Sequence, residues 1–173
     1  MKSYSVLFLS IMMIVTGCSL FLREPSPPPQ ELVEAMEQAR ENFDAVKRLP
    51  VYEKYAHNFQ EAESELIHAE NYLQDHLYEQ ANLSAQKSLE ASQWILRQFY
   101  KDTIALSAQK AKDKIAAISD EDPGNPLQEF LPEINDILDY SEGIGNDQQE
   151  INITKILADF DKITKIEHTT QKT

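Results

Sequence analysis

Residues 78–118 have the sequence YEQANLSAQKSLEASQWILRQFYKDTIALSAQKAKDKIAAI, which contains neither glycine nor proline. Alanine, leucine, glutamine, glutamate and lysine dominate it, and these residues favour helices because they lose little side-chain freedom on folding. The stretch predicts one continuous helix about 60 Å long, at 1.5 Å per residue. A helix of this length outreaches its neighbours, so its second half needs a covering surface of its own. One face carries apolar and small side chains: Ala81, Ala85, Ser88, Ser92, Ile95, Phe99, Ile104, Ala108, Ala111, Ile115 and Ile118.

Two shorter helices are predicted before the long helix. In both, apolar residues recur at alternating spacings of three and four, which places them on one helix face. Proline at position 50 separates the two helices, because proline breaks a helix interior. Residues 75–77 are expected to form the turn into the long helix, although no glycine marks it. The apolar faces are Leu32, Met36, Ala39, Phe43 and Val46 over 31–48, then Tyr52, Tyr55, Phe59, Ala62, Leu66, Ala69 and Leu73.

A shorter helical hairpin is predicted after the long helix. The acidic loop 119–126 (SDEDPGNP) ends the long helix. Regular helix is expected to begin near Leu131, because Pro132 suits a first helical turn. Gly143 and Gly145 predict its end, and Asp147 is expected to cap the last helix. The hairpin, residues 127–168, is expected to cover the distal part of the long helix, and the polar tail from His168 onward is expected to fray.

The predicted fold is therefore an all-α bundle of about five helices with a long third helix. Residues 31–118 form a three-helix domain, 119–126 the acidic loop and 127–168 the hairpin. Few valine and threonine residues are present to support strands. The net charge of −13 argues against nucleic acid, because phosphate binding requires clustered lysine and arginine. It also argues against a body that lies flat on anionic lipid.

The amino terminus has the organisation of an export signal. Lys2 is followed by the apolar run 6–15, which is short for a membrane span. The run ends in Val15-Thr16-Gly17-Cys18, which resembles the lipobox of bacterial lipoproteins. The resemblance implies a signal peptide of residues 1–17, cleavage before Cys18 and acyl chains such as palmitate on that cysteine. An ordinary signal peptide with a chance cysteine, or an uncleaved anchor, is the alternative.

Sorting and tethering follow from the same resemblance. Ser19 stands where enterobacterial lipoproteins of the inner membrane carry aspartate, so it implies transfer to the outer membrane, facing the periplasm. Residues 18–30 then form a proline-rich tether, because clustered prolines favour extended chain. The membrane would be contacted through lipid on Cys18. The sequence leaves the oligomeric state open.

Two further resemblances concern the helical body. The segments Ala69-Glu70-Asn71-Tyr72 and Leu77-Tyr78-Glu79-Gln80-Ala81 resemble the centre of a tetratricopeptide repeat, in which small residues let two helices approach. The proline that ends such repeats is missing. The stretch 32–92 is similar to small envelope lipoproteins carrying the DUF4398 domain. That family implies an accessory envelope component and assigns no functional residue.

Candidate chemistry is sparse. His57, Glu61, Glu65 and His68 share a face of the second helix, and Glu65-x-x-His68 has a di-iron spacing, but no second Glu-x-x-His motif occurs. A solvated face is the favoured interpretation. There is no nucleophile elbow, P-loop or dinucleotide motif. The expectation is a chain with no catalytic residue, no metal and no cofactor.

The remaining candidate surface is aromatic. Trp94, Phe99 and Tyr100 are a candidate partner contact, since aromatic residues are frequent in binding hot spots. Packing between the two hairpins is the favoured alternative, because buried aromatics also dominate cores. The sequence thus favours a non-enzymatic scaffold or adaptor that binds another envelope protein. A pilotin-like assembly factor and, less favoured, a small-molecule or metal-binding bundle are the alternatives.

Overall fold

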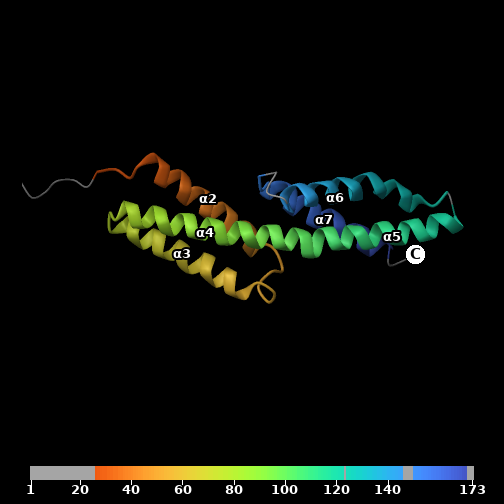
Figure 1. Ribbon diagram of the computed structural model, residues 1–173, viewed down its shortest axis with the longest axis horizontal. Coiled ribbons are helices and arrows are strands. Elements are labelled where there is room, and N and C mark those ends of the chain that lie inside the picture. The colour runs from red at the N-terminus through yellow and green to blue at the C-terminus, as the bar shows by residue number, and fades with distance from the viewer. Residues whose placement is uncertain (1–25, 123, 146–149, 171–173) are drawn as a thin grey trace, which may run out of the picture.

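The computed structural model describes residues 26–122, 124–145 and 150–170, and in these ranges the chain is all-helical (Figure 1). This confirms the predicted all-α fold with a long third helix. That helix consists of three segments that follow one another without a break. The elements are α2 (Gln30–Lys47), α3 (Ala56–Gln74), α4 (Tyr78–Phe99), the π-helix η1 (Tyr100–Ala105), α5 (Leu106–Glu121), the 3-10 helix η2 (Pro126–Phe130), α6 (Leu131–Gly145) and α7 (Ile153–Thr170).

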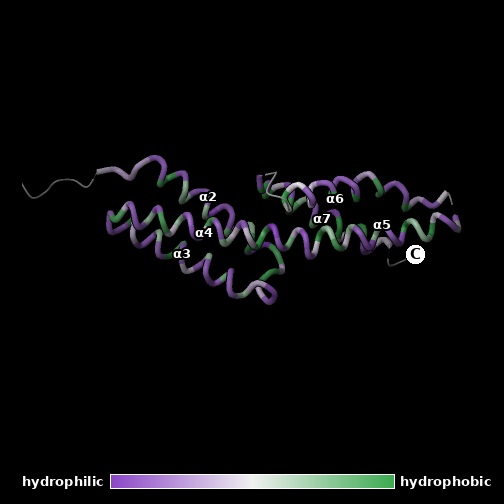
Figure 2. The backbone as a smooth tube through the Cα atoms, in the orientation of Figure 1, coloured by the Kyte–Doolittle hydropathy of each residue, from purple (hydrophilic) through white to green (hydrophobic). Residues whose placement is uncertain are grey.

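The long helix α4–η1–α5 is the axis of an elongated molecule (Figure 1). Helices α2 and α3 pack against α4, and α6 and α7 pack against η1 and α5. The N-terminal unit and the C-terminal hairpin therefore occupy opposite halves of one rod. Figure 2 shows apolar positions recurring along each helix. None of the described helices is long and apolar enough to cross a membrane.

Small side chains allow α3 and α4 to approach closely. Ala62, Ala69, Ala81 and Ala85 are all fully buried where the two helices meet. Ser88 Oγ donates a hydrogen bond to the carbonyl oxygen of Ala62 across this contact, at 2.8 Å. A large residue at any of these positions would force the helices apart. The predicted small-residue face of the long helix is confirmed.

The connection between α2 and α3 contributes to the core at the middle of the rod. Leu49, Val51 and Tyr55 are buried in the same cluster as Phe99 and Tyr100. The expectation that the second helix carries Tyr52 on its apolar face is wrong, because α3 begins at Ala56 and Tyr52 is 56% exposed. Residues 52–54, between the buried Val51 and Tyr55, form a turn that precedes α3.

The turn between α3 and α4 lies at residues 75–77, as predicted. His76 adopts a left-handed backbone with φ 58°, which histidine tolerates better than most residues. The Leu77 amide donates to the carbonyl oxygen of Tyr72 at 2.8 Å and closes the turn. The turn therefore forms without glycine. The sequence did not predict the left-handed conformation of His76.

The start and end of α7 differ from expectation. Asp147 lies outside the described residues, but α7 begins only at Ile153. Its cap is Asn152, whose Oδ1 accepts from the Lys155 amide at 3.0 Å and satisfies a free helix-end donor. The tail was expected to fray from His168, yet α7 continues to Thr170, which is 4% exposed. Burial against α5 explains the longer helix.

Candidate functional site

The π-helix η1 lies where the N-terminal unit and the C-terminal hairpin meet the long helix (Figure 1). A π-helix has i→i+5 hydrogen bonds and so contains one residue more per turn, and such segments are frequent at functional sites. Here the extra residue produces the five-residue step from Phe99 to Ile104, both of which are buried. It also presents Tyr100 and Asp102 to different neighbours.

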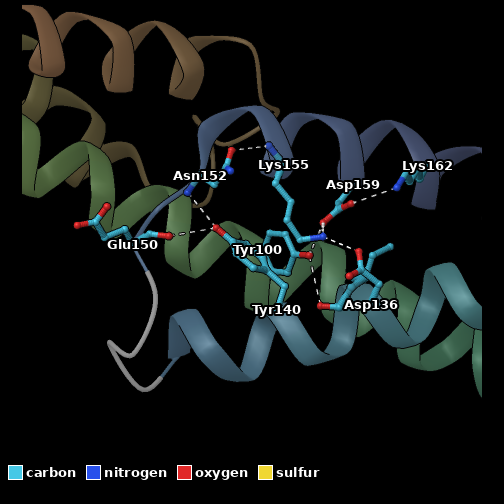
Figure 3. A network of polar contacts seen from close by, with 9 residues as sticks. Tyr100, Asp136, Tyr140, Glu150, Asn152, Lys155, Asp159 and Lys162 are labelled. Carbon is cyan, nitrogen blue, oxygen red and sulfur yellow. Dashed lines mark hydrogen bonds and ion pairs between the residues drawn. The ribbon is translucent and has the colours of Figure 1, made fainter.

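Tyr100 faces the C-terminal hairpin (Figure 3). Its hydroxyl lies 2.6 Å from Asp159 Oδ2 on α7, to which it donates, and 3.3 Å from the carbonyl oxygen of Ile137 on α6. The exposed fractions of Tyr100 and Asp159 are 0% and 1%. Burial, and then the bond to Asp159, raise the pKa of Tyr100 far above its ordinary value. The phenol therefore stays neutral and remains a hydrogen-bond donor.

Two lysines compensate the buried carboxylate of Asp159. Lys155 Nζ lies 3.1 Å from Asp159 Oδ2 and 2.6 Å from Asp136 Oδ2, and Lys162 Nζ lies 3.8 Å from Asp159 Oδ1. Burial lowers the pKa of Lys155, but its bonds to both aspartates outweigh burial and raise it. The bond to Lys155 lowers the pKa of Asp136. The carboxylate of Asp159 is thus paired, as a buried charge requires.

Tyr140 extends this network to the segment before α7. Its ring packs edge-on against Tyr100, with ring centres 5.1 Å apart, and Lys155 Nζ lies 5.1 Å from the centre of the Tyr140 ring. The Asn152 amide donates to the Tyr140 hydroxyl at 2.9 Å, and that hydroxyl lies 3.4 Å from the carbonyl oxygen of Glu150 (Figure 3). The network fixes α6, α7 and η1 to one another. Tyr100 and Asp159 are closed to solvent, so this pair orients helices and is not placed to reach a substrate.

Asp102 faces the connection between α2 and α3. Its Oδ2 accepts from the Tyr55 hydroxyl at 3.0 Å and lies 2.9 Å from Lys54 Nζ. The bond to Lys54 lowers the pKa of Asp102, while burial acts in the opposite direction. Tyr55 also packs edge-on against Trp94, with ring centres 5.8 Å apart. The π-helix is therefore bonded to both halves of the rod, through Tyr100 on one side and Asp102 on the other.

The structure separates the three aromatic residues predicted as a partner contact. Trp94 is 43% exposed, whereas Phe99 and Tyr100 are buried. Phe99 packs against Phe160 of α7, with ring centres 5.4 Å apart. Phe99 and Tyr100 therefore pack between the two halves of the rod, as the favoured interpretation had it, and they are not a partner contact. Trp94 is the accessible member of the set.

The other candidate residues lie apart from this junction. His57, Glu61 and His68 are exposed on α3, and Glu65 lies 3.5 Å from Lys87 Nζ. Among the described residues, no group of three or more histidine, cysteine or acidic side chains is arranged to hold a metal ion.

The residues predicted to direct lipidation and sorting lie outside the described part of the chain. Val15, Thr16, Gly17, Cys18 and Ser19 all precede the described residues. The last part of the predicted tether, 26–29, is exposed and enters α2. Tyr78 donates a hydrogen bond to the carbonyl oxygen of Ser26, which holds this segment at the start of α4.

Asp159 was not among the residues predicted for a site. It lies on the apolar stripe of α7, between Ile156 and Ile163, and all three side chains are buried. A carboxylate at helical spacing within an apolar face is the signal that identifies such a residue, because a buried charge needs a partner. The partner, Tyr100, is far away in sequence and gave no such signal.

A groove of about 770 Å³ borders the junction, between α2, α4 and the segment that leads into α7.

Comparison of the chain with models of protein families, with curated proteins and with solved structures finds no match. The structure itself defines the class as an elongated all-α bundle with a π-helical junction.

Proposed function

We propose that the chain is a non-enzymatic lipoprotein that acts as a scaffold or adaptor for another protein of the cell envelope. Its anchor is lipid on Cys18, and its location is the outer membrane, facing the periplasm. The resemblance of residues 15–18 to a lipobox supports the anchor, and Ser19 supports the sorting. Two or three acyl chains are sufficient for stable anchoring, because each buried methylene contributes about 0.8 kcal/mol.

The observation that carries the adaptor function is the exposure of Trp94. Exposed tryptophans are enriched among residues that dominate binding energy. Contact with the buried ring of Tyr55, which is 7% exposed, restricts the Trp94 side chain before a partner arrives. A side chain that is already ordered loses less entropy on binding. The adjacent Lys54–Asp102 pair adds polar groups beside the aromatic surface.

The shape of the molecule suits a tethered adaptor. Residues 26–29 enter at the end of the rod where α2 begins, and α5 ends at the far end (Figure 1). An anchor at Cys18 would confine Trp94 to the vicinity of the membrane. Confinement raises the effective concentration of a surface for a partner in the same membrane, so that a weak contact suffices. The acidic body would be repelled by anionic lipid and would stay free for that partner.

Photo-crosslinking in cells tests this function. A photoreactive residue replaces Trp94, and the control places it at Ile67 of α3, which is 51% exposed. We expect one envelope protein to crosslink at position 94, not at 67, and less strongly when Cys18→Ala removes the anchor. Equal products at both positions, or none at position 94, would refute the adaptor. A captured partner that is misplaced in cells lacking the chain would identify a pilotin-like assembly factor.

A further inference from the structure

We infer that the groove beside the junction binds an extended, basic segment of polypeptide. This inference rests on the adaptor function and deepens it, because it names the chemistry of the partner. The groove lies on the α2 side of α4, and Gln93 and Arg97 line it. Helix α2 forms one wall, and the non-helical segment 150–152 before α7 forms the other.

The size and the walls of the groove fit a ligand. Its volume of about 770 Å³ lies within the range of ligand sites, about 300–1,000 Å³. The wall at Asn152 is held in place, because the backbone N–H of Asn152 donates to the Tyr140 hydroxyl at 2.9 Å and Tyr140 packs on the buried ring of Tyr100. The wall at α2 is a regular helix. The groove is thus formed without a ligand, which reduces the entropy lost on binding.

Amide side chains line the groove at Gln38, Asn42, Gln93 and Asn152. A side-chain amide has two N–H donors and an oxygen acceptor, so it can pair with the alternating N–H and C=O groups of an extended backbone even where it already makes one bond within the chain, as Asn42 Nδ2 and Asn152 Oδ1 do. Asn42 supplies the sharpest indication, because it is only 8% exposed and its Oδ1 has no hydrogen-bond partner. Its Nδ2 donates to the Gln38 carbonyl oxygen at 2.9 Å. A buried acceptor without a donor is costly. Because this atom is closed to solvent, a ligand N–H would satisfy it once the Asn42 side chain turns toward the groove.

The charges of the lining favour a ligand rich in donors. Glu41 and Glu150 both line the groove and can only accept hydrogen bonds when ionised. The cation among the lining residues, Arg97, already has a contact within the chain. Lysine side chains on the ligand would pair with the two carboxylates, and the net charge of −13 would speed their approach.

The apolar part of the lining favours a peptide over a saccharide. Ile151 and Ile153 lie two positions apart and can receive one apolar side chain of an extended segment, whose side chains alternate in direction. None of the described lining residues is aromatic, so a sugar ring would find no face on which to stack. A peptide with basic and small apolar residues in alternation satisfies the amides, the carboxylates and the isoleucines together.

Titration of the full chain, purified in detergent, tests the inference. The probe is a capped hexapeptide of alternating alanine and lysine, at 150 mM salt, with an alanine–glutamine hexapeptide and chitotetraose as comparisons. We expect the lysine peptide to shift the side-chain amide NMR signals of Asn42 and Gln93. Replacing both groove carboxylates (Glu41→Gln with Glu150→Gln) should weaken its binding about tenfold, as loss of two exposed charge pairs would.

The matched control is Glu63→Gln with Glu133→Gln, which removes the same charge from exposed positions away from the groove. This control should leave the dissociation constant within about twofold, because charges remote from the site act only through screened attraction. Equal weakening by both pairs, or shifts caused only by chitotetraose, would overturn the inference. If position 94 crosslinks but the lysine peptide has no effect, the inference about the groove is refuted and the adaptor function is retained. If the lysine peptide binds but position 94 does not crosslink, the inference about the groove is supported and the adaptor function is refuted.

Discussion

Tyr100 and Asp159 are 59 positions apart in sequence, yet the hydroxyl of one donates to the carboxylate of the other at 2.6 Å, and both side chains are buried. The bond joins the first residue of the π-helix to the middle of α7. Since Asp102, two positions later, is bonded to the connection between α2 and α3, the π-helix is the place where both halves of the rod are fixed to one axis. The groove depends on that arrangement, because its walls come from both halves.

Tyr100→Phe should destabilise the fold by about 1–3 kcal/mol, because it leaves a buried carboxylate with one hydrogen-bond donor fewer. Urea unfolding followed by circular dichroism measures the change. The comparison is Tyr55→Phe, whose lost partner Asp102 has a side chain 41% exposed and can bond to water instead. The Tyr55 variant should lose less stability than the Tyr100 variant. The reverse order would contradict the assigned importance of the buried bond.

Coupling between the two partners can be measured separately from the cost of each substitution. A double-mutant cycle combines Tyr100→Phe with Asp159→Asn, which keeps the shape of residue 159 but removes its charge. We expect a coupling free energy of about 1–2 kcal/mol, within the range for residues in direct contact. A cycle of Tyr100→Phe with Asp113→Asn on the exposed face of α5 should give a value near zero. If the coupling free energy in this second cycle were as large as in the first, the Tyr100→Phe substitution would act by loosening the whole fold and not by removing one bond.

The helices themselves could be predicted because their signals are local. Apolar residues of α2 recur at helical spacing and are buried, and Leu131 begins α6 where Pro132 indicated a first turn. The π-helix had a weaker signal, the five-residue step from Phe99 to Ile104, which resembles ordinary scatter in a long apolar face. We attribute the π-helix to tertiary packing, because Tyr100 bonds to α7 and Asp102 bonds to the connection between α2 and α3 within one turn.

The Tyr100–Asp159 bond and the groove could not be predicted from local patterns. Both depend on how α7 is placed beside η1 and α2, and that placement results from packing over the whole hairpin. The local pattern does separate Phe99 from Trp94, because Phe99 belongs to the predicted apolar face of the long helix and Trp94 does not. Phe99 is buried against Phe160 of α7, whereas Trp94 is 43% exposed.

The bond between Asp102 and Lys54 should make part of the stability depend on pH. The pKa of Asp102 is lowered from 3.8 by this bond, so the ionised form is favoured in the folded chain. Its stabilisation is complete above pH 4 to 5 and is lost as the pH falls through the lowered pKa. The effect is small because both side chains are largely exposed. Asp102→Asn should therefore be less stable than the native chain at pH 7 and equally stable near pH 2. If the free energies of unfolding of the variant and the native chain still differ at pH 2, the destabilisation is due to packing and not to the ionised pair.

Lipid attachment makes a prediction that does not depend on a partner. Bacteria that express the chain and are fed radiolabelled palmitate should label it, and Cys18→Ala should abolish the label because the thiol and the cleavage position are both lost. Asp substituted for Ser19 should keep the label and shift the chain from outer-membrane to inner-membrane fractions. Label that survives Cys18→Ala would rule out this cysteine as the lipid site. The single cysteine of the chain makes the result unambiguous.

Deletion of one residue tests the π-helix directly. Removing Thr103 from η1 leaves a regular α-helix, because a π-helix differs from it by one inserted residue, and α5 then keeps the face it presents to α6 and α7. Removing Gln109 from α5 instead rotates every later residue by about 100° and withdraws Ala111 and Ile115 from the core. The Thr103 deletion should therefore fold, with a loss of about 1–2 kcal/mol from disturbed bonds of Tyr100 or Asp102. The Gln109 deletion should cost several kcal/mol, since a buried isoleucine alone contributes about 1.5–3 kcal/mol. Thermal unfolding distinguishes the two, and equal losses would show that the extra residue is not what sets the register of the long helix.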